Sequence, residues 1–121
     1  MQYEEMTEQI IGCAYRVYNK MGFGFLESVY EKCMEIELKK AGLAVKSQES
    51  INVFYEGETV GEFVADLVVD DTVIVELKFV RRVVNAHETQ LVNYLVATKI
   101  DVGLILNFGD RKVEVTRGSS V

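Results

Sequence analysis

Residues 66–78 read DLVVDDTVIVELK, and this stretch decides the fold class. Two runs of aliphatic residues flank the turn formers Asp70, Asp71 and Thr72, which is the pattern of two antiparallel strands joined by a tight turn. The second run is almost entirely Val, Ile and Leu, as expected for a strand that is buried on both faces. We therefore expect the centre of a sheet here, covered by helices.

The same stretch carries charged residues within its apolar strands. Because side chains alternate along a strand, Glu76 and Lys78 share one face of the second strand. A three-residue loop pairs Val69 with Val73, and counting outward from that pair brings Asp66 opposite Glu76. The sequence thus predicts two carboxylates that face each other across the ladder.

Two carboxylates in this arrangement require something that offsets their charge. Like charges directly opposite each other destabilise a sheet, and an ionised group inside a buried strand is costly. A divalent cation such as Mg²⁺ prefers oxygen ligands and takes one or two carboxylates. Lys78 would then lie beside the metal and could orient or deprotonate an attacking water. The alternative is a structural ion pair, in which Lys78 neutralises one acid and the other acid reaches solvent.

The rest of the chain predicts helices and strands around this pair. The expected elements, in order, are helices over residues 3–20 and 26–41, strands over 51–55, 59–69 and 73–79, a helix over 85–98, and strands over 102–108 and 112–116. Residues 118–121 are expected to fray. The order α-α-β-β-β-α-β-β predicts a mixed α/β or α+β sheet in one domain, 1–121. The break between the first two helices, at residues 22–25, contains two Phe rings that we expect to anchor the turn in apolar surroundings.

Composition excludes several classes of protein. The chain has 121 residues, of which 49% are hydrophobic and 26% charged, as in one globular domain with a core. Cys13 and Cys33 lie in apolar helical patterns and are expected to be reduced core residues. The single histidine, His87, argues against zinc and against His-dependent triads. The acidic start and the lack of a long apolar run predict a cytoplasmic protein without a membrane span.

The charge is unevenly distributed along the chain. The formal net charge is −6 and the pI is near 4.8, which argues against non-specific binding of polyanions. Residues 81–121, however, carry four acids and six bases. The candidate phosphate contacts in this third are Arg81, Arg82, Lys99, Arg111, Lys112 and Arg117.

Two predicted helices add polar groups that fit the same chemistry. Glu27 and Tyr30 lie three residues apart on one face of the second helix. Gln90 and Tyr94 lie four residues apart on the third helix, with His87 one turn earlier, and these neutral groups suit the holding of a lysine, a water or a phosphate. The alternative is structural: Glu27 would complement the helix N-terminus and Tyr30 would be a half-buried core ring. Gln90, Tyr94 and His87 would then form a polar helix face.

Several motifs occur in a characteristic order between residues 10 and 117. They are Gly24-x-x-Glu27-x-x-Tyr30, Ala65-Asp66, Glu76-Leu77-Lys78, Gln90-x-x-x-Tyr94 and the run GLILNFG over residues 103–109. In these motifs the chain resembles the small GxxExxY proteins of the PD-(D/E)xK nuclease superfamily. One departure is that Ala65 stands where the superfamily's name has proline.

The resemblance implies a restriction-endonuclease-like fold, with an α-β-β-β-α-β core and an additional N-terminal helix. It further implies a nuclease that uses Mg²⁺ or Mn²⁺ and hydrolyses phosphodiester bonds with a water that the metal activates. The implied metal-binding residues are Asp66, Glu76, Leu77 and Glu27. The implied catalytic residues are Lys78, Glu76 and Asp66, together with Gln90 and Tyr94, which look like the Q-x-x-x-Y motif of RecB-type nucleases.

The expected partner is nucleic acid, with DNA favoured over RNA. The residues expected to contact it are Arg81, Arg82, Tyr94 and Lys112. Two other readings stay open: a non-catalytic module for binding protein or nucleic acid that keeps the nuclease fold, and a buried ion network without function. The sequence also leaves open a homodimer or a protein partner.

Overall fold

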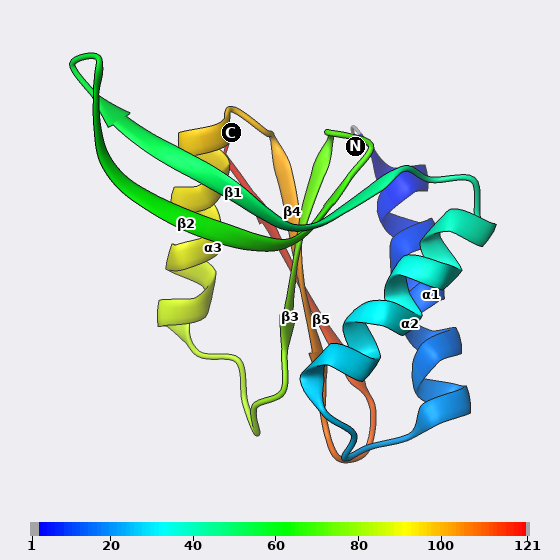
Figure 1. The fold of residues 1–121 in the computed structure, drawn as a ribbon. Helices are drawn as coiled ribbons and strands as arrows, with labels where there is room; N and C mark the ends of the chain where they lie inside the picture. The colour runs from blue at the N-terminus through cyan, green and yellow to red at the C-terminus, as the bar shows by residue number, and fades with distance from the viewer. Residues whose placement is uncertain (1–2, 121) are drawn as a thin grey trace.

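The computed structural model describes residues 3–120, which form three helices and five strands (Figure 1). Their bounds are α1 Glu4–Met21, α2 Glu27–Lys40, β1 Val45–Tyr55, β2 Glu58–Val69, β3 Val73–Lys78, α3 Asn85–Thr98, β4 Val102–Phe108 and β5 Val113–Ser119. The order is the predicted α-α-β-β-β-α-β-β.

The five strands form one mixed sheet in the order β1-β2-β3-β4-β5. The β3 and β4 strands are parallel and α3 connects them, whereas the other neighbouring strands are antiparallel. Figure 1 shows α1 and α2 on one face of the sheet and α3 on the other. This arrangement explains why every residue of β4 is buried: both of its faces are covered by helices.

The core has one apolar layer on each face of the sheet. On one side, α1 contributes a stripe of Ile10, Cys13, Ala14 and Val17, which recur at helical spacing and pack toward the strands. On the other side, α3 packs through Leu91 and Leu95, together with apolar residues of β2, β3 and β4. Burying both faces of the sheet holds β3 rigidly at its centre.

Two glycines allow α3 to lie close to the sheet. A Cβ atom built on Gly103 of β4 would lie 2.7 Å from Leu91 Cδ1 and 3.2 Å from the Ile74 carbonyl oxygen. A Cβ atom on Gly118 of β5 would lie 2.8 Å from Leu91 Cδ2. Larger residues at these two positions would push the helix away, so the glycines determine how near α3 lies to the central strands.

The sheet is longer at both ends than the sequence predicts. The β1 strand begins at Val45 rather than at residue 51, because it pairs with β2 along almost its whole length. The β5 strand runs to Ser119, which pairs with Val102, so the expectation that residues 118–121 fray is wrong for Gly118 and Ser119. Val121 lies outside the described residues.

The turn between α1 and α2 is held differently from our expectation. Phe23 and Phe25 are both exposed, so they do not anchor the turn in apolar surroundings. The anchor is instead the buried Tyr30, whose hydroxyl donates to the Gly22 carbonyl oxygen at 2.6 Å and accepts from the Phe25 N–H at 3.3 Å. A phenol that reaches the backbone satisfies the polar groups of the turn, which a Phe ring cannot do.

The two cysteines lie in the helical layer of α1 and α2. Cys13 is buried and Cys33 is half-buried beside the α1–α2 layer, and both are free thiols. Within residues 3–120, the helices are too short or too polar to cross a bilayer.

Candidate active site

A cleft of about 440 Å³ lies where β2 and β3 meet the N-terminal parts of α2 and α3. Its lining consists of Glu27, Val64, Asp66, Glu76, Leu77, Lys78, Phe79, Val80, His87, Gln90 and Tyr94. Every residue that the sequence suggests for metal binding or catalysis is among them. Four elements thus bring together residues that are far apart in the sequence.

The acidic pair forms at the point where β2 and β3 separate. The ladder pairs Val69 with Val73, as predicted, and continues to Leu67 and Val75. Beyond that pair, the side chains replace the backbone acceptors: the Asp66 N–H donates to Glu76 Oε2 and the Leu77 N–H donates to Asp66 Oδ2, each at 2.8 Å. Each carboxylate therefore uses one oxygen to hold the strands together and has a second oxygen for other partners.

The other side of β2 is also irregular at Asp66. The β1–β2 ladder pairs Ser47 with Leu67 and Glu49 with Ala65, and it is interrupted between these pairs at Gln48, which has a φ of 50°. In a regular strand, residues 65 and 68 would point to opposite faces of the sheet. Ala65 and Val68 instead belong to the same apolar layer, so the alternation of side chains is interrupted between them. The irregular backbone frees Asp66 from regular pairing on both sides, so its carboxylate reaches the cleft.

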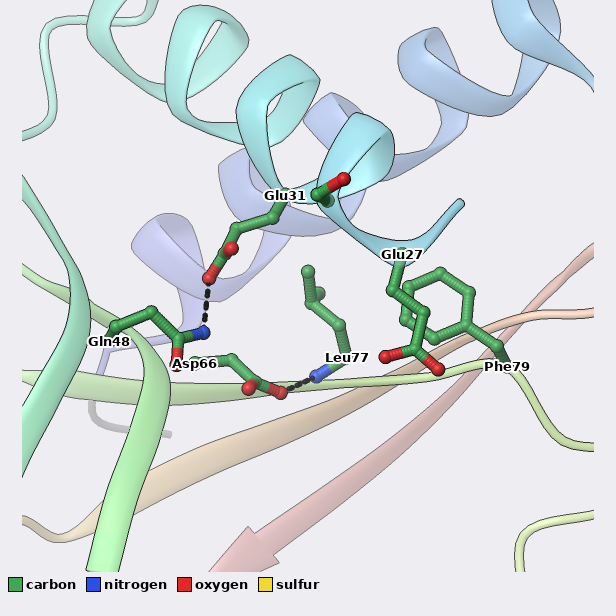
Figure 2. Close-up of a pocket in the computed structure, with 7 residues that line it drawn as sticks. Glu27, Glu31, Gln48, Asp66, Leu77 and Phe79 are labelled. Atoms are coloured by element: carbon green, nitrogen blue, oxygen red, sulfur yellow. Dashed lines mark hydrogen bonds between the residues drawn. The ribbon is translucent and has the colours of Figure 1, made fainter. Parts of the chain in front are cut away.

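Gln48 links the acidic pair to α2. Its Nε2 donates to Glu31 Oε1 at 2.6 Å, and Figure 2 shows Glu31, Gln48 and Asp66 gathered at one side of a smaller hollow of about 240 Å³. This hollow shares Glu27, Asp66, Leu77 and Phe79 with the cleft, so the two spaces are adjacent. Its acidic residues come from α2 and β2 together.

Burial makes the charges of both carboxylates unfavourable. Burial raises the pKa of Asp66, while the Leu77 N–H, the Lys78 charge and a hydrogen bond from Gln48 partly oppose this rise. Burial and the neighbouring Asp66 charge raise the pKa of Glu76 to about 7. The pair therefore holds more negative charge than its own hydrogen bonds stabilise, which favours the binding of a cation.

Tyr94 reaches the cleft from α3. Its ring stacks on Phe63 of β2, with centroids 3.6 Å apart and an interplanar angle of 5°. Burial, followed by the charges of Glu76 and Asp66, raises the pKa of the Tyr94 phenol, so its hydroxyl stays protonated and is a hydrogen-bond donor. Phe63 thus helps to fix the direction of a polar group that faces the acids.

The segment after β3 is held by a buried side chain of β4. The Asn107 Oδ1 accepts from the Val80 N–H at 3.0 Å, and its Nδ2 donates to the Val80 carbonyl oxygen at 2.8 Å. Phe79 and Val80 follow Lys78 directly and line the cleft. The two bonds from Asn107 therefore give the wall beside the lysine a defined position.

Glu27 lies at the cleft but is not part of a compact cluster of ligands. Within residues 3–120, no group of three or more His, Cys, Asp or Glu has the geometry to hold a metal ion. Glu27 stands at the first position of α2 and lines both the cleft and the smaller hollow, near Phe79 in Figure 2. It therefore lines the same cleft as the acidic pair, and its charge adds to the effect of burial in raising the pKa of Asp66.

The expected nucleic-acid contacts are more dispersed than the acidic residues. Arg81 lines a neighbouring depression together with Phe23, Phe79, Val80 and Asp110. Arg82 is exposed on the same loop, and Lys112 is exposed in the turn before β5. Arg117, a further candidate, donates to Thr7 Oγ1 at 2.5 Å and so contacts α1. Of the four residues expected to bind nucleic acid, only Tyr94 lines the cleft itself.

Sequence reasoning missed several residues that shape the site. Gln48 and Glu31 carry no motif, and their meeting depends on how α2 packs beside β1. Asn107 did leave a signal, because it is the one polar side chain in the buried run VGLILNF of β4. A buried amide needs partners, and the nearest unpaired backbone groups are those of the loop that follows the neighbouring strand β3.

The comparisons with known proteins bear on the family and the fold of the chain. A family model described as the PD-(D/E)XK nuclease superfamily matches residues 4–118. Curated proteins provide no significant match. One similar solved structure is that of SSO0001, with 16% identity and a TM-score of 0.62, covering 98% of this chain and 59% of the other. The chain thus spans little more than half the length of that protein.

A second similar structure is an alkaline exonuclease (LHK-Exo) from Laribacter hongkongensis. It has 14% identity and a TM-score of 0.53, and the match covers 93% of this chain and 81% of the other. These structures and the mixed sheet between helices confirm the predicted restriction-endonuclease-like α+β fold. Since the family model extends over nearly all of the sequence, the chain belongs to the PD-(D/E)XK nuclease superfamily.

Proposed function

We propose that this protein is a metal-dependent nuclease that hydrolyses phosphodiester bonds in nucleic acid, with DNA favoured over RNA. The observation that carries the proposal is the carboxylate pair Asp66 and Glu76, which shares one cleft with Lys78. Membership of the nuclease superfamily supports the same class of reaction.

The chemistry of the cleft suits a hard divalent cation. Mg²⁺ and Mn²⁺ favour oxygen ligands. Burial raises the pKa of both acids, and the Asp66 charge further raises the pKa of Glu76. A bound cation would remove this cost. We propose Asp66 and Glu76 as its main ligands, with the Leu77 backbone beside them. Glu27 would act from the same cleft.

The chain's own residues would orient the substrate and the attacking water. When bound, the cation supplies positive charge that activates water and stabilises the developing negative charge of the phosphate. Lys78, on the same strand as Glu76, would hold the water through its ammonium group. Gln90 and the protonated Tyr94 hydroxyl would donate hydrogen bonds to a substrate phosphate or help to position Lys78.

We further propose that the chain is a GxxExxY protein and that residues 1–121 form a single nuclease-like domain. The motifs from Gly24 to Gly109 support this assignment: those around Glu27, Asp66, Glu76 and Gln90 contribute residues to the cleft, and the run over 103–109 forms most of the buried strand β4. A cytoplasmic location is our expectation. We also propose a homodimer or a protein partner, because a second chain would add to a nucleic-acid-binding surface that has few basic residues of its own.

A metal titration tests the central proposal without any assumption about the substrate. Mn²⁺ would be added to the wild type, Asp66→Asn and Asp71→Asn, and bound metal followed by electron paramagnetic resonance. Asp71 is a matched control, because it lies in the next turn, where it pairs with Lys46 at 3.0 Å. We expect saturable binding in the wild type and in Asp71→Asn. Equal binding by all three proteins up to about millimolar metal would refute the carboxylate site.

A cleavage assay separates the nuclease from a non-catalytic module. The net charge of −6 and the small size favour a module, since a nuclease that acts alone usually needs more basic surface or a partner. Lys78→Ala should keep the fold, measured by circular dichroism, and lose strand cleavage in the presence of Mg²⁺ by a factor of about 100 or more. Absence of cleavage in the wild type, despite metal binding, would favour the module.

A further inference from the structure

We propose that a rigid aromatic surface beside the cleft stacks unpaired bases, so that the nuclease acts on single-stranded nucleic acid. This inference rests on the proposed function and names its substrate class. The surface, which we call the ring surface, consists of the exposed Phe23, Phe25, Leu26 and Arg81, together with the partly buried Phe79, whose ring packs on Tyr30 and Phe108.

The ring surface exposes three large apolar side chains that lie close together in the sequence. Phe23, Phe25 and Leu26 are 59%, 51% and 76% exposed, although they follow one another almost directly in the sequence. Two shallow depressions connect them: one contains Phe23, Phe79 and Arg81, and the other contains all three exposed residues together with Phe79. Contiguous exposed apolar area of this kind marks a binding surface.

The backbone that carries these rings is firmly held. Gly22 and Gly24 have φ values of 70° and 106°, a region that favours glycine, and the Tyr30 hydroxyl binds the backbone on both sides of Phe23. On the other wall, Asn107 fixes Val80 through two hydrogen bonds. The rings are therefore exposed in a defined conformation of the loop. Because the loop is already ordered, binding a ligand there costs little conformational entropy.

The ring surface adjoins the cleft. Phe79 lines the cleft, the smaller hollow and both depressions, and Glu27 lines the cleft and the depression beneath Phe25. Figure 2 shows the Phe79 ring directly beside Glu27. A strand whose phosphate lay at the acidic pair would therefore place its neighbouring nucleotides over these rings.

The chemistry of the surface favours unpaired bases as its occupant. Aromatic rings and a guanidinium group stack on the face of any base, and such contacts tolerate any sequence. In a duplex, each base face is covered by its neighbours, so only a single strand or a frayed end offers its bases. The net charge of −6 opposes the phosphates of any nucleic acid, so the affinity for a single strand would have to come from stacking and from local bases such as Arg81.

The test compares two exposed phenylalanines that differ in position. A fluorescent thymidine oligomer of about twelve nucleotides and a duplex of equal length would be titrated, in EDTA, with the wild type, Phe23→Ala, Phe23→Tyr and Phe54→Ala. Phe54 is a matched control, because it is 63% exposed near the end of β1 and outside the ring surface. Anisotropy reports binding, circular dichroism reports folding, and sedimentation reports the oligomeric state.

We expect Phe23→Ala to weaken single-strand binding by about 5- to 100-fold, while Phe23→Tyr and Phe54→Ala keep it. The duplex should bind about tenfold more weakly than the single strand. Equal binding by Phe23→Ala and Phe54→Ala, or equal affinity for the duplex, would overturn the inference. A wild-type dimer that Phe23→Ala converts to a monomer would overturn it too, by assigning the surface to a second copy.

A parallel cleavage assay with Mg²⁺ keeps the two proposals apart. Cleavage by the wild type without any effect of Phe23→Ala on binding would refute the ring surface and leave the nuclease intact. Binding that depends on Phe23 without cleavage by the wild type would refute the nuclease and leave the ring surface as a single-strand binding site.

Discussion

Glu76 is the residue whose surroundings oppose its own charge most strongly. Burial and the adjacent Asp66 raise its pKa to about 7, from an ordinary value of 4.5. A carboxyl with a raised pKa in the folded protein favours folding below its unfolded pKa, and this contribution is lost as the pH rises through the folded pKa. The metal-free protein should therefore lose stability between about pH 4.5 and pH 7.

Glu76→Gln should consequently stabilise the metal-free protein. Glutamine keeps an oxygen that can accept from the Asp66 N–H but carries no charge. We expect a gain of roughly 1–3 kcal/mol near pH 8 that disappears near pH 4, measured by urea unfolding in EDTA. Glu56→Gln, at the exposed β1–β2 turn, should leave the free energy of unfolding unchanged at both pH values. A gain that is equal at both pH values would contradict the electrostatic explanation.

Gln48 should influence metal binding through Asp66. Its side chain bridges from Glu31 toward Asp66 at the point where β1 is irregular. Gln48→Leu should weaken Mn²⁺ binding by about tenfold, because Asp66 would lose the side chain that orients its carboxylate toward the metal. The readout is the paramagnetic resonance titration.

The matched control for Gln48 is Asn52→Ala, on an exposed position of the same strand. It should leave Mn²⁺ affinity unchanged. If Gln48→Leu lowers the melting temperature but not the affinity, then Gln48 supports the fold and does not position Asp66.

At the scale of elements, the site depends on how closely α3 approaches the sheet. Gln90 and Tyr94 reach the cleft from this helix, and Leu91 between them occupies the space that Gly103 leaves open. The Tyr94 ring adds a second attachment through Phe63 on β2. The position of the polar residues of α3 is thus set by apolar contacts on the neighbouring face of the helix.

Gly103→Ala should destabilise the protein by about 1–3 kcal/mol, because the new methyl group would meet both Leu91 and the Ile74 carbonyl oxygen. Gly61→Ala is the control, since a Cβ atom there would lie 3.9 Å from its nearest neighbour. Chemical denaturation of both variants measures the difference. Equal stability would show that α3 adjusts its position without cost.

At the scale of the whole molecule, the distribution of charge limits how nucleic acid can bind. The net charge is −6, whereas Arg81 and Arg82 follow directly after the strand that carries Glu76 and Lys78. A local basic segment beside an acidic cleft would direct a phosphate backbone along one wall.

Arg81→Ala/Arg82→Ala should reduce the dependence of oligonucleotide binding on salt. We expect the slope of log affinity against log salt to decrease in magnitude by about 1–2, since each lost phosphate contact releases about one counterion fewer. Lys39→Ala/Lys40→Ala, at the other end of α2, removes the same charge and should change the slope little. Equal slopes in the two double variants would place Arg81 and Arg82 outside the interface.

The sequence by itself determined the central strand pair and the composition of the cleft. Alternation, the turn at residues 70–72 and helical spacing are local properties, so they predicted the order of elements, the pairing of Val69 with Val73 and the approach of Asp66 to Glu76. The motifs identified the polar residues that now line one cleft.

The tertiary structure alone decided how the acids are held and which rings face solvent. Asp66 and Glu76 bond to backbone N–H groups because β2 and β3 separate after Leu67, and Gln48 meets Glu31 because α2 packs beside β1. Phe23 is exposed, and the buried Tyr30 holds the turn through its hydroxyl instead. Such contacts join residues distant in sequence, and their geometry follows from the packing of whole elements, which no local pattern encodes.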